Sequence, residues 1–454
     1  MIRRALLAVV VSGCALLAAS TAPATAQSTT PPIQHLVVIL EENSTFDHTF
    51  GTLHGVDGLH VGRKVTQAGG ETVRLRGFSD LGPRAFTVPK GEEVLSNGPT
   101  AASTAFNDGR MDGFVRAQGA TDKNARLSFT LIDRATPSPW RKLARRGVVF
   151  DRYFSSYLAG SLPNTLSLVA GDAYGRDQGS NADFTSLWHS DIPTLFDRAT
   201  EAGVSWKYYV GGLEQIHQRK VANGSYAGSA DATPSALYWA PILSMQRFWT
   251  DPALAQNVRS QADLFADAAS GSLPAITYVL PQPTTHEPLV LGPDLRLLSI
   301  VNAIETSPTW ESTAVVVVWD DWGGYYDHVA PPVTADGQQL GMRVPMLLLS
   351  PWAQGGTVSH QTLDHSSIPA LATSLFGLDP IEPHTAVPNG PWLSAPVDDP
   401  RILGLSHSPP YEAAGMTHAH NVFGLYLLTM FVIVGVLGWL GFSMLRKPVR
   451  GGSA

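Results

Sequence analysis

The sequence predicts an α/β fold in which helices flank a central, mostly parallel β-sheet. Residues 315–319 (VVVVW) and 34–40 (QHLVVIL) are short apolar runs, the pattern of strands that are buried on both faces of such a sheet. Acidic and amide side chains follow both runs directly, at the carboxyl ends of the strands, where open α/β sheets bind their ligands. Only 15% of the residues are charged, and 42 glycines and 33 prolines indicate a loop-rich globular enzyme.

The first predicted strand, residues 34–40, leads into Glu42 and Asn43. One carboxylate oxygen and one amide oxygen at this point are both acceptable ligands for a hard divalent cation. The alternative is a helix N-cap formed by Asn43 or Ser44. A cap explains Asn43 better than it explains the pair of glutamates that precedes it.

The next segments are less informative. Residues 57–99 lack periodicity and are expected to form loops and edge strands, and residues 106–114 (FNDGRMDGF) form a compact turn with two glycines. Residues 139–149 place apolar side chains at helical spacing, and residues 148–157 are then expected to form a strand.

Ser161 lies where the next helix is predicted to begin. Pro163 suits the first helical turn, and Leu166, Leu168 and Val169 follow as apolar positions. The free N–H groups and the field at a helix N-terminus favour anions, so a phosphate could be held there while the serine hydroxyl attacks it. An ordinary N-cap serine is the alternative.

The remaining elements are predicted in sequence order. They are a helix at 191–202, a strand at 204–210, a strand at 275–280, a helix at 294–306, the central strand at 315–319, a strand at 344–350 and a helix at 363–375. His286 follows the strand at 275–280 and is either a solvated loop residue or a group of the site.

The central strand ends on two adjacent carboxylates, Asp320 and Asp321, followed by Gly323 and Gly324. Aspartate is rarely buried without a partner, so two at the end of a buried strand need an explanation. Two hard oxygen donors suit a divalent cation, and the glycines allow a tight turn beside it. A solvated strand-to-turn junction is the alternative.

Length and charge limit the possible functions. The 454 residues allow one large α/β domain or two smaller ones. The 31 basic and 38 acidic residues give a net charge of −7, and the body of the chain has no long basic run, which argues against a nucleic-acid partner. Cys14 is the single cysteine, so no internal disulfide can form.

Both ends of the chain predict an encounter with a membrane. Residues 1–26 have a basic start, an apolar run and an Ala-Thr-Ala cleavage site, as signal peptides do, although lipidation of Cys14 is an alternative. Residues 422–445 are long and apolar enough for a transmembrane helix, and the basic tail at 446–454 is expected to be cytoplasmic. Residues 27–380 would then form an extracytoplasmic domain of a single-pass membrane protein, followed by a Pro-rich stalk at 381–421.

Five motifs in order resemble the bacterial phosphoesterase family of secreted phospholipases C and acid phosphatases, within the alkaline-phosphatase-like superfamily. They are ENSTFDHTFG, FNDGRMDGF, GSLPNTLSLVAG, WDDWGGYYDHVAPP and RVPMLLLSPWAQGG, and the resemblance covers about residues 33–378. It implies an alkaline-phosphatase-like fold and hydrolysis of a phosphate ester or a phospholipid.

The resemblance also implies roles for residues of this chain. The metal ligands of one divalent cation would be Glu42, Asn43, Asp320 and Asp321. Ser161 would be the nucleophile that forms a phosphoseryl intermediate, and His286 would act near the leaving group. Asp327 and His328 match a further signature and would have a supporting role.

The chain departs from the family pattern at two places. Many relatives have a histidine ahead of the M-D-G-F turn, where this chain has none at residues 96–99, and relatives often have His or Arg where this chain has Thr165. The resemblance therefore leaves phospholipase C and acid phosphatase action both open. A non-catalytic surface protein that keeps the fold is the rival in another class. Phosphoglycerol transfer and sulfate-ester hydrolysis also occur in the superfamily, but the SLPN segment lacks a sulfatase motif.

Overall fold

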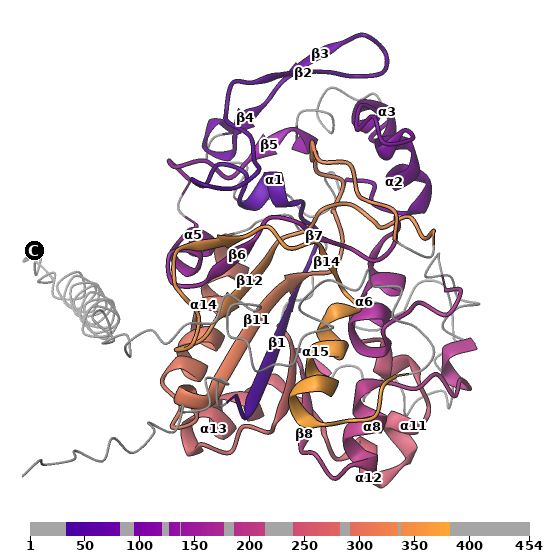
Figure 1. Cartoon of the computed structure of the whole chain (residues 1–454), viewed down its shortest axis with the longest axis vertical. Helices are drawn as coiled ribbons and strands as arrows, with labels where there is room; N and C mark the ends of the chain where they lie inside the picture. The colour runs from indigo at the N-terminus through magenta and orange to yellow at the C-terminus, as the bar shows by residue number, and fades with distance from the viewer. Residues whose placement is uncertain are drawn as a thin grey trace, which may run out of the picture.

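The structure is a computed structural model. It describes residues 33–381 with gaps at 82–94, 120–126, 137, 177–185, 214–238, 282–290 and 335–336. The predicted α/β fold is confirmed, because one large sheet lies between helices in this part of the chain (Figure 1).

The central sheet has eight strands in the order β13, β6, β12, β11, β1, β10, β8 and β9. Their bounds are β1 (His35–Glu41), β6 (Val148–Phe150), β8 (Trp206–Val210), β9 (Val258–Ser260), β10 (Ile276–Leu280), β11 (Thr313–Trp319), β12 (Met346–Leu349) and β13 (Thr357–Ser359). All strands run in one direction except β12, which is antiparallel to both of its neighbours. The sheet is therefore mixed, with β1 and β11 at its centre.

Helices cover the sheet in two groups (Figure 1). One group consists of α6 (Ser161–Ala170), α8 (Leu195–Glu201) and α15 (Ser367–Phe376), which contact one another. In the other group, α14 (Leu291–Glu305) contacts both α5 (Pro139–Ala144) and α13 (Gln261–Ser270). Shorter helices are α1 (Phe46–Thr49), α2 (Pro99–Phe106), α3 (Phe114–Ala117), α11 (Arg247–Thr250), α12 (Pro252–Ala255) and the 3₁₀ turns η1 (Phe78–Leu81), η3 (Pro241–Ser244) and η4 (Trp310–Ser312).

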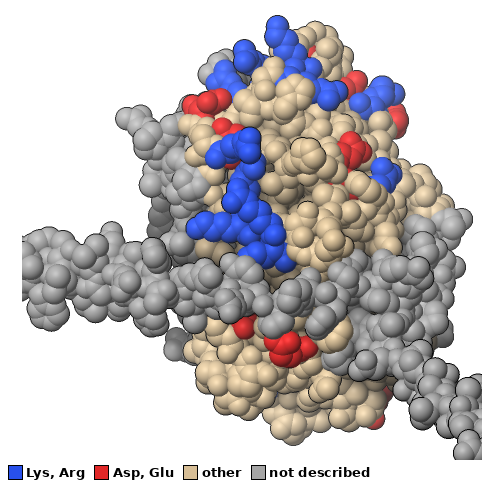
Figure 2. Space-filling view, turned by 60° about the vertical axis from the view of Figure 1, so that its left-hand side comes forward, with Lys and Arg blue, Asp and Glu red and all other residues tan. Residues whose placement is uncertain are grey.

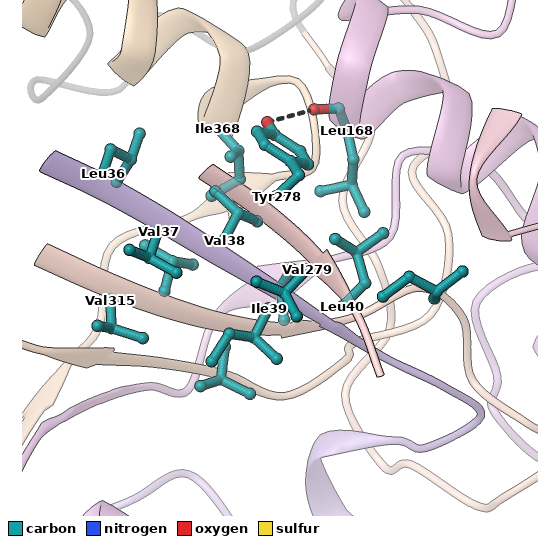
Figure 3. Packing of buried hydrophobic residues seen from close by; sticks show 14 of the residues in the cluster. Leu36, Val37, Val38, Ile39, Leu40, Leu168, Tyr278, Val279, Val315 and Ile368 are labelled. Carbon is teal, nitrogen blue, oxygen red and sulfur yellow. Dashed lines mark hydrogen bonds between the residues drawn. The ribbon is translucent and has the colours of Figure 1, made fainter. Parts of the chain in front are cut away.

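The core explains why the central strands are continuous apolar runs. All seven residues of β11 are buried. Along β1, Leu36 and Val38 point to the side of Leu168 and Ile368, whereas Val37 and Ile39 point to the opposite side (Figure 3). Because side chains alternate between the two faces and both faces are covered, no position on the strand favours a polar residue.

A second, smaller apolar cluster lies beyond the carboxyl ends of these strands. It is formed by α2, α3 and residues in or beside two small sheets, β2 (Lys64–Thr66) with β3 (Thr72–Arg74) and β4 (Arg76–Gly77) with β5 (Thr130–Leu131). A third small sheet pairs β7 (Tyr153–Phe154) with β14 (Leu363–Asp364), and its Tyr153 and Leu363 belong to the main core. Trp322 and Tyr326 pack into this cluster against Phe114, with ring centroids 5.9 and 4.8 Å apart. The segment after β11 is thereby held between the central sheet and this second cluster.

Some boundaries differ from the prediction. The helix expected at 363–375 begins at Ser367, because residues 363 and 364 pair with β7. The strand expected at 148–157 is divided into β6 and β7, which belong to different sheets. In both places pairing with distant segments overrides the local pattern.

The predicted fold class included a transmembrane helix, and the structure corrects this part of it. No helix in the described residues is long and apolar enough to cross a membrane. Their longest helix, α14, has 15 residues and is about 22 Å long, less than the ~30 Å of a bilayer core. The predicted span at 422–445 lies outside the described residues, as do the signal peptide at 1–26, the tail at 446–454 and all of the stalk except its first residue.

Charged side chains are sparse on the surface. Most of the described surface visible in Figure 2 carries neither Lys or Arg nor Asp or Glu, in line with the charged fraction of 15%. Basic side chains gather in the upper part of this view, and acidic side chains lie among them.

Candidate active site

The candidate site lies where β1 and β11 end side by side. The two strands are parallel and in register, with Glu41 opposite Trp319. The segments that leave them are joined by hydrogen bonds: the backbone N–H of Asn43 donates to Oδ1 of Asp320 at 3.1 Å, and that of Ser44 donates to the carbonyl of Asp321 at 2.9 Å. The sheet thus brings together the two pairs of residues that the sequence proposed as metal ligands.

The backbone between the strands is tightly folded. Asn43 has a positive φ of 58°, which asparagine tolerates better than most residues. Gly323 also has a positive φ of 57°, and a Cβ there would lie 2.4 Å from the backbone of Asn43. Only glycine allows this approach, so Gly323 sets how closely the two segments meet.

The carboxylates of the site are buried and not fully paired. Asp320 and Asp321 are 1% and 0% exposed. Within the described residues, Oδ2 of Asp320 and Oε1 of Glu42 are buried without a hydrogen-bond partner. Burial raises the pKa of Asp320 to about 6, and burial together with the charge of Asp320 raises the pKa of Asp321. The pKa of Glu42 is raised by burial and then by the two aspartates.

These residues fit a divalent cation. Three carboxylates and an amide oxygen match the preference of Mg²⁺, Ca²⁺ and Mn²⁺ for oxygen ligands. Buried carboxylates with unpaired oxygens are costly unless a cation compensates them. The unpaired oxygens of Glu42 and Asp320 are therefore suited to bind a cation.

Ser161 joins this cluster from a third element. It is the first residue of α6 and is 8% exposed. Its Oγ donates to Oδ2 of Asp321 at 3.2 Å and accepts from Nε1 of Trp239, also at 3.2 Å. Asn164 shapes the turn before it, since its amide bonds to the backbone of Tyr157 at 2.9 Å and of Gly160 at 3.0 Å. The serine hydroxyl is thus held against a carboxylate that could accept its proton.

Two further residues that the sequence singled out are not among the contacts of this cluster in the described residues. His286 is outside the described residues. The hydroxyl of Thr165 bonds to the carbonyl of Leu162 within α6, so this position bonds back to its own helix.

A second acidic group, Asp47 with Asp327 and His328, also has the spacing of a metal site. However, the buried guanidinium of Arg343 lies between the carboxylates, with Nη2 at 3.0 Å from both Asp47 and Asp327. His328 completes the group, with Nδ1 at 2.7 Å from Asp47. Because a fixed cation already compensates the two carboxylates, we interpret this group as an ion network that ties α1 to the segment after β11.

Three residues of the site were not found from the sequence. Trp239 contacts the serine hydroxyl, as described above. Asn97 donates its side-chain amide to Asn43 and Asp321. His365 donates Nε2–H to the carbonyl of Asp320 at 2.7 Å, and its Nδ1 lies 2.9 Å from the hydroxyl of Tyr153. A signal existed only for His365, which follows the apolar strand at 344–350 at the start of a predicted helix.

His365 fixes the backbone at the end of β11. A carbonyl oxygen can only accept, so Nε2 carries the proton and Nδ1 accepts from Tyr153. Burial lowers the pKa of His365 to about 4, which keeps the ring neutral at physiological pH. A neutral ring with both nitrogens bonded gives Asp320 a firm support without adding charge.

Comparison with known proteins identifies the family of the chain. Residues 33–379 match the model of the Phosphoesterase family. The chain is 28% identical over 428 residues to "Phospholipase C A" of Mycobacterium tuberculosis, covering 83% of this chain and 78% of that protein. It is 25% identical over 424 residues to "Non-hemolytic phospholipase C" of Pseudomonas aeruginosa, covering 81% and 56%. It is 25% identical over 395 residues to "Non-specific phospholipase C6" of Arabidopsis thaliana, covering 76% and 68%. The chain belongs to the Phosphoesterase family and is a hydrolase of phosphoric esters.

Proposed function

We propose that the protein is a metal-dependent phospholipase C that cleaves a phospholipid phosphodiester through a phosphoseryl intermediate on Ser161. The observation that carries the proposal is the bond from Ser161 Oγ to Asp321, within a group of buried carboxylates whose oxygens are not all paired. The names of the similar proteins support the choice of a phospholipid diester.

The residues of the site divide the work. Glu42, Asn43, Asp320 and Asp321 would hold one divalent cation, which, when bound, lowers the pKa of a coordinated hydroxyl and neutralises phosphoryl oxygens. Ser161 attacks phosphorus, so its O–P bond forms while the bond from phosphorus to the lipid alcohol breaks and the alcohol takes up a proton. Water then cleaves the phosphoserine, which restores the hydroxyl and releases the head-group phosphate.

The surroundings of Ser161 favour an anionic group. Ser161 begins α6, and the first backbone N–H groups of a helix have no partner within the helix and attract anions. The indole N–H of Trp239, bonded to the serine hydroxyl, orients the lone pairs of that oxygen. We further propose that the protein acts outside the cytoplasm, on the basis of the signal peptide expected at residues 1–26.

The test compares the protein with Ser161→Ala and with the control Ser167→Ala. Ser167 lies in the same helix, but its hydroxyl bonds to the carbonyl of Pro163. The assay follows phosphocholine release from phosphatidylcholine vesicles and hydrolysis of p-nitrophenyl phosphate, each with and without a chelator. Ser161→Ala is expected to lower the rate by a factor on the order of 10⁵, as loss of a covalent nucleophile does elsewhere, and the chelator is expected to abolish activity.

The control variant is expected to keep its activity, because its hydroxyl does not reach the cluster. Activity that survives Ser161→Ala would contradict the nucleophile assignment. Hydrolysis of the monoester alone would show that the enzyme is a phosphatase of the same family.

A further inference from the structure

We propose that Asn97 is a positioning residue of the candidate metal site and holds Asn43 and Asp321 in the arrangement that binds the cation. This inference rests on the proposed function, since it concerns the same site. The side-chain nitrogen of Asn97 lies 2.7 Å from Oδ1 of Asn43 and 3.1 Å from each carboxylate oxygen of Asp321. One amide group therefore joins the ligand that follows β1 to a ligand that follows β11.

Asn97 comes from a third segment, the loop immediately before α2. The structure shows that this loop reaches the site and presents an amide to it.

The loop that carries Asn97 is itself held by residues near Asp321. Nε1 of Trp322 donates to the carbonyl of Asn97 at 2.8 Å. The amide of Gln118 bonds to both backbone groups of Ser96, at 2.8 and 2.9 Å, and to the carbonyl of Gly324 at 3.3 Å. Asn97 therefore approaches the ligands from a fixed backbone, so that its side chain holds Asn43 and Asp321 rather than following them.

The chemistry of an amide suits this position. Its N–H groups donate to oxygens of two ligands, while it carries no charge and does not titrate. Groups that hydrogen-bond to metal ligands fix the orientation of the ligands, and their loss typically lowers metal affinity about 10–100-fold. In this site, removing the amide would leave the Asp321 carboxylate with one fewer donor and would leave the Asn43 side chain held by its bond to Glu42.

The test measures cation binding directly. The full chain is stripped with a chelator, dialysed and titrated with MnCl₂ in a calorimeter, because Mn²⁺ accepts oxygen ligands. Asn97→Ala is expected to weaken Mn²⁺ binding about 10-fold or more. The matched control is Asn302→Ala, an exposed asparagine on α14, which is expected to bind Mn²⁺ as the unchanged protein does. Trp322→Phe, which removes the N–H that holds the Asn97 carbonyl, is expected to weaken binding several-fold and serves if Asn97→Ala does not fold.

The outcomes separate this inference from the proposed function. If Asn97→Ala only lowers the midpoint of thermal unfolding and leaves Mn²⁺ affinity unchanged, Asn97 is a structural contact and the inference is wrong. If the unchanged protein binds Mn²⁺ and Asp321→Asn abolishes binding while Asn97→Ala does not alter it, the metal site stands and the role of Asn97 fails. If the unchanged protein binds no Mn²⁺ and is active without it, both fail together.

Discussion

At the scale of one residue, Asp320 is a buried carboxylate whose hydrogen bonds compensate its charge only in part. Its Oδ1 accepts two backbone N–H bonds, from Asn43 and Asp321, whereas its Oδ2 has no partner within the described residues. The carboxylate is thus positioned by one oxygen and left available by the other. That division is what a ligand needs, and it has a cost when no cation is bound.

This cost gives a pH-dependent prediction for Asp320→Asn in the absence of metal. The folded pKa of Asp320 is raised to about 6, above the unfolded value near 4, so ionisation of Asp320 destabilises the folded state at neutral pH. The penalty disappears as the pH falls through 6 toward 4. Asp320→Asn is therefore expected to raise the free energy of unfolding at pH 7.5 by on the order of 2 kcal/mol, and the gain should vanish near pH 4.

Urea unfolding of the chelator-treated protein at several pH values measures the effect. Asp267→Asn is the matched control, and it is expected to change the free energy of unfolding in the opposite direction. Although burial alone would raise the pKa of Asp267, its bonds from Lys207 and Tyr209 lower it, so its charge is stabilising and its loss should destabilise at pH 7.5. An Asp320→Asn variant that is less stable than the unchanged protein at pH 7.5 would show that the carboxylate is compensated after all.

At the scale of elements, the turn after β11 sets the distance between the two ligand segments. Gly323→Ala combines a positive φ with a Cβ that would meet the Asn43 backbone at 2.4 Å. Gly377, after α15, has a similar φ of 63°, but no atom lies within 4 Å of its Cβ position. The pair of variants therefore separates backbone strain from the steric clash.

We expect Gly377→Ala to cost about 1–2 kcal/mol of stability and to leave activity unchanged. Gly323→Ala is expected to cost about 2–5 kcal/mol and to lower phosphoester hydrolysis as well, because Asn43 must move. Denaturant unfolding and a rate assay on folded protein check both. Equal effects of the two variants would mean that the backbone of Asn43 can give way without consequence.

The sequence predicted which polar residues follow the central strands and open α6 because these signals are local. Asp320 and Asp321 directly follow an unbroken apolar strand, and Ser161 opens a helix with proline in its first turn. Asn97 and Trp239 have no such signal, since each follows a polar stretch without periodicity and reaches the site only through tertiary packing. The boundaries that were missed have the same cause, as pairing between distant segments overrode local pattern.

At the scale of the whole molecule, cation binding should stabilise the fold. Variants should then show which of the two acidic groups binds the cation. A ligand that binds only the folded state adds about 2.7 kcal/mol at 100 times its dissociation constant. Mn²⁺ is therefore expected to raise the thermal unfolding midpoint of the unchanged protein. Asp321→Asn should lose this rise and His328→Ala should keep it, because the group around His328 is already compensated by Arg343.

Thermal scans with and without Mn²⁺ test this for the three proteins. If His328→Ala instead abolishes the rise while Asp321→Asn preserves it, the metal site is the Asp47 group and the ion network has been misinterpreted.

The position of β1 at the centre of the sheet has a consequence for biosynthesis. Both of its neighbours, β10 and β11, come far later in the chain, and Asn43 and Asp320 are 277 residues apart. At roughly 5–20 residues per second, about 14–55 s of translation separate the two halves of the site. During that time β1 is an apolar segment without its two neighbouring strands, which makes it prone to aggregation. The same delay keeps the site incomplete until nearly the entire catalytic domain has left the ribosome.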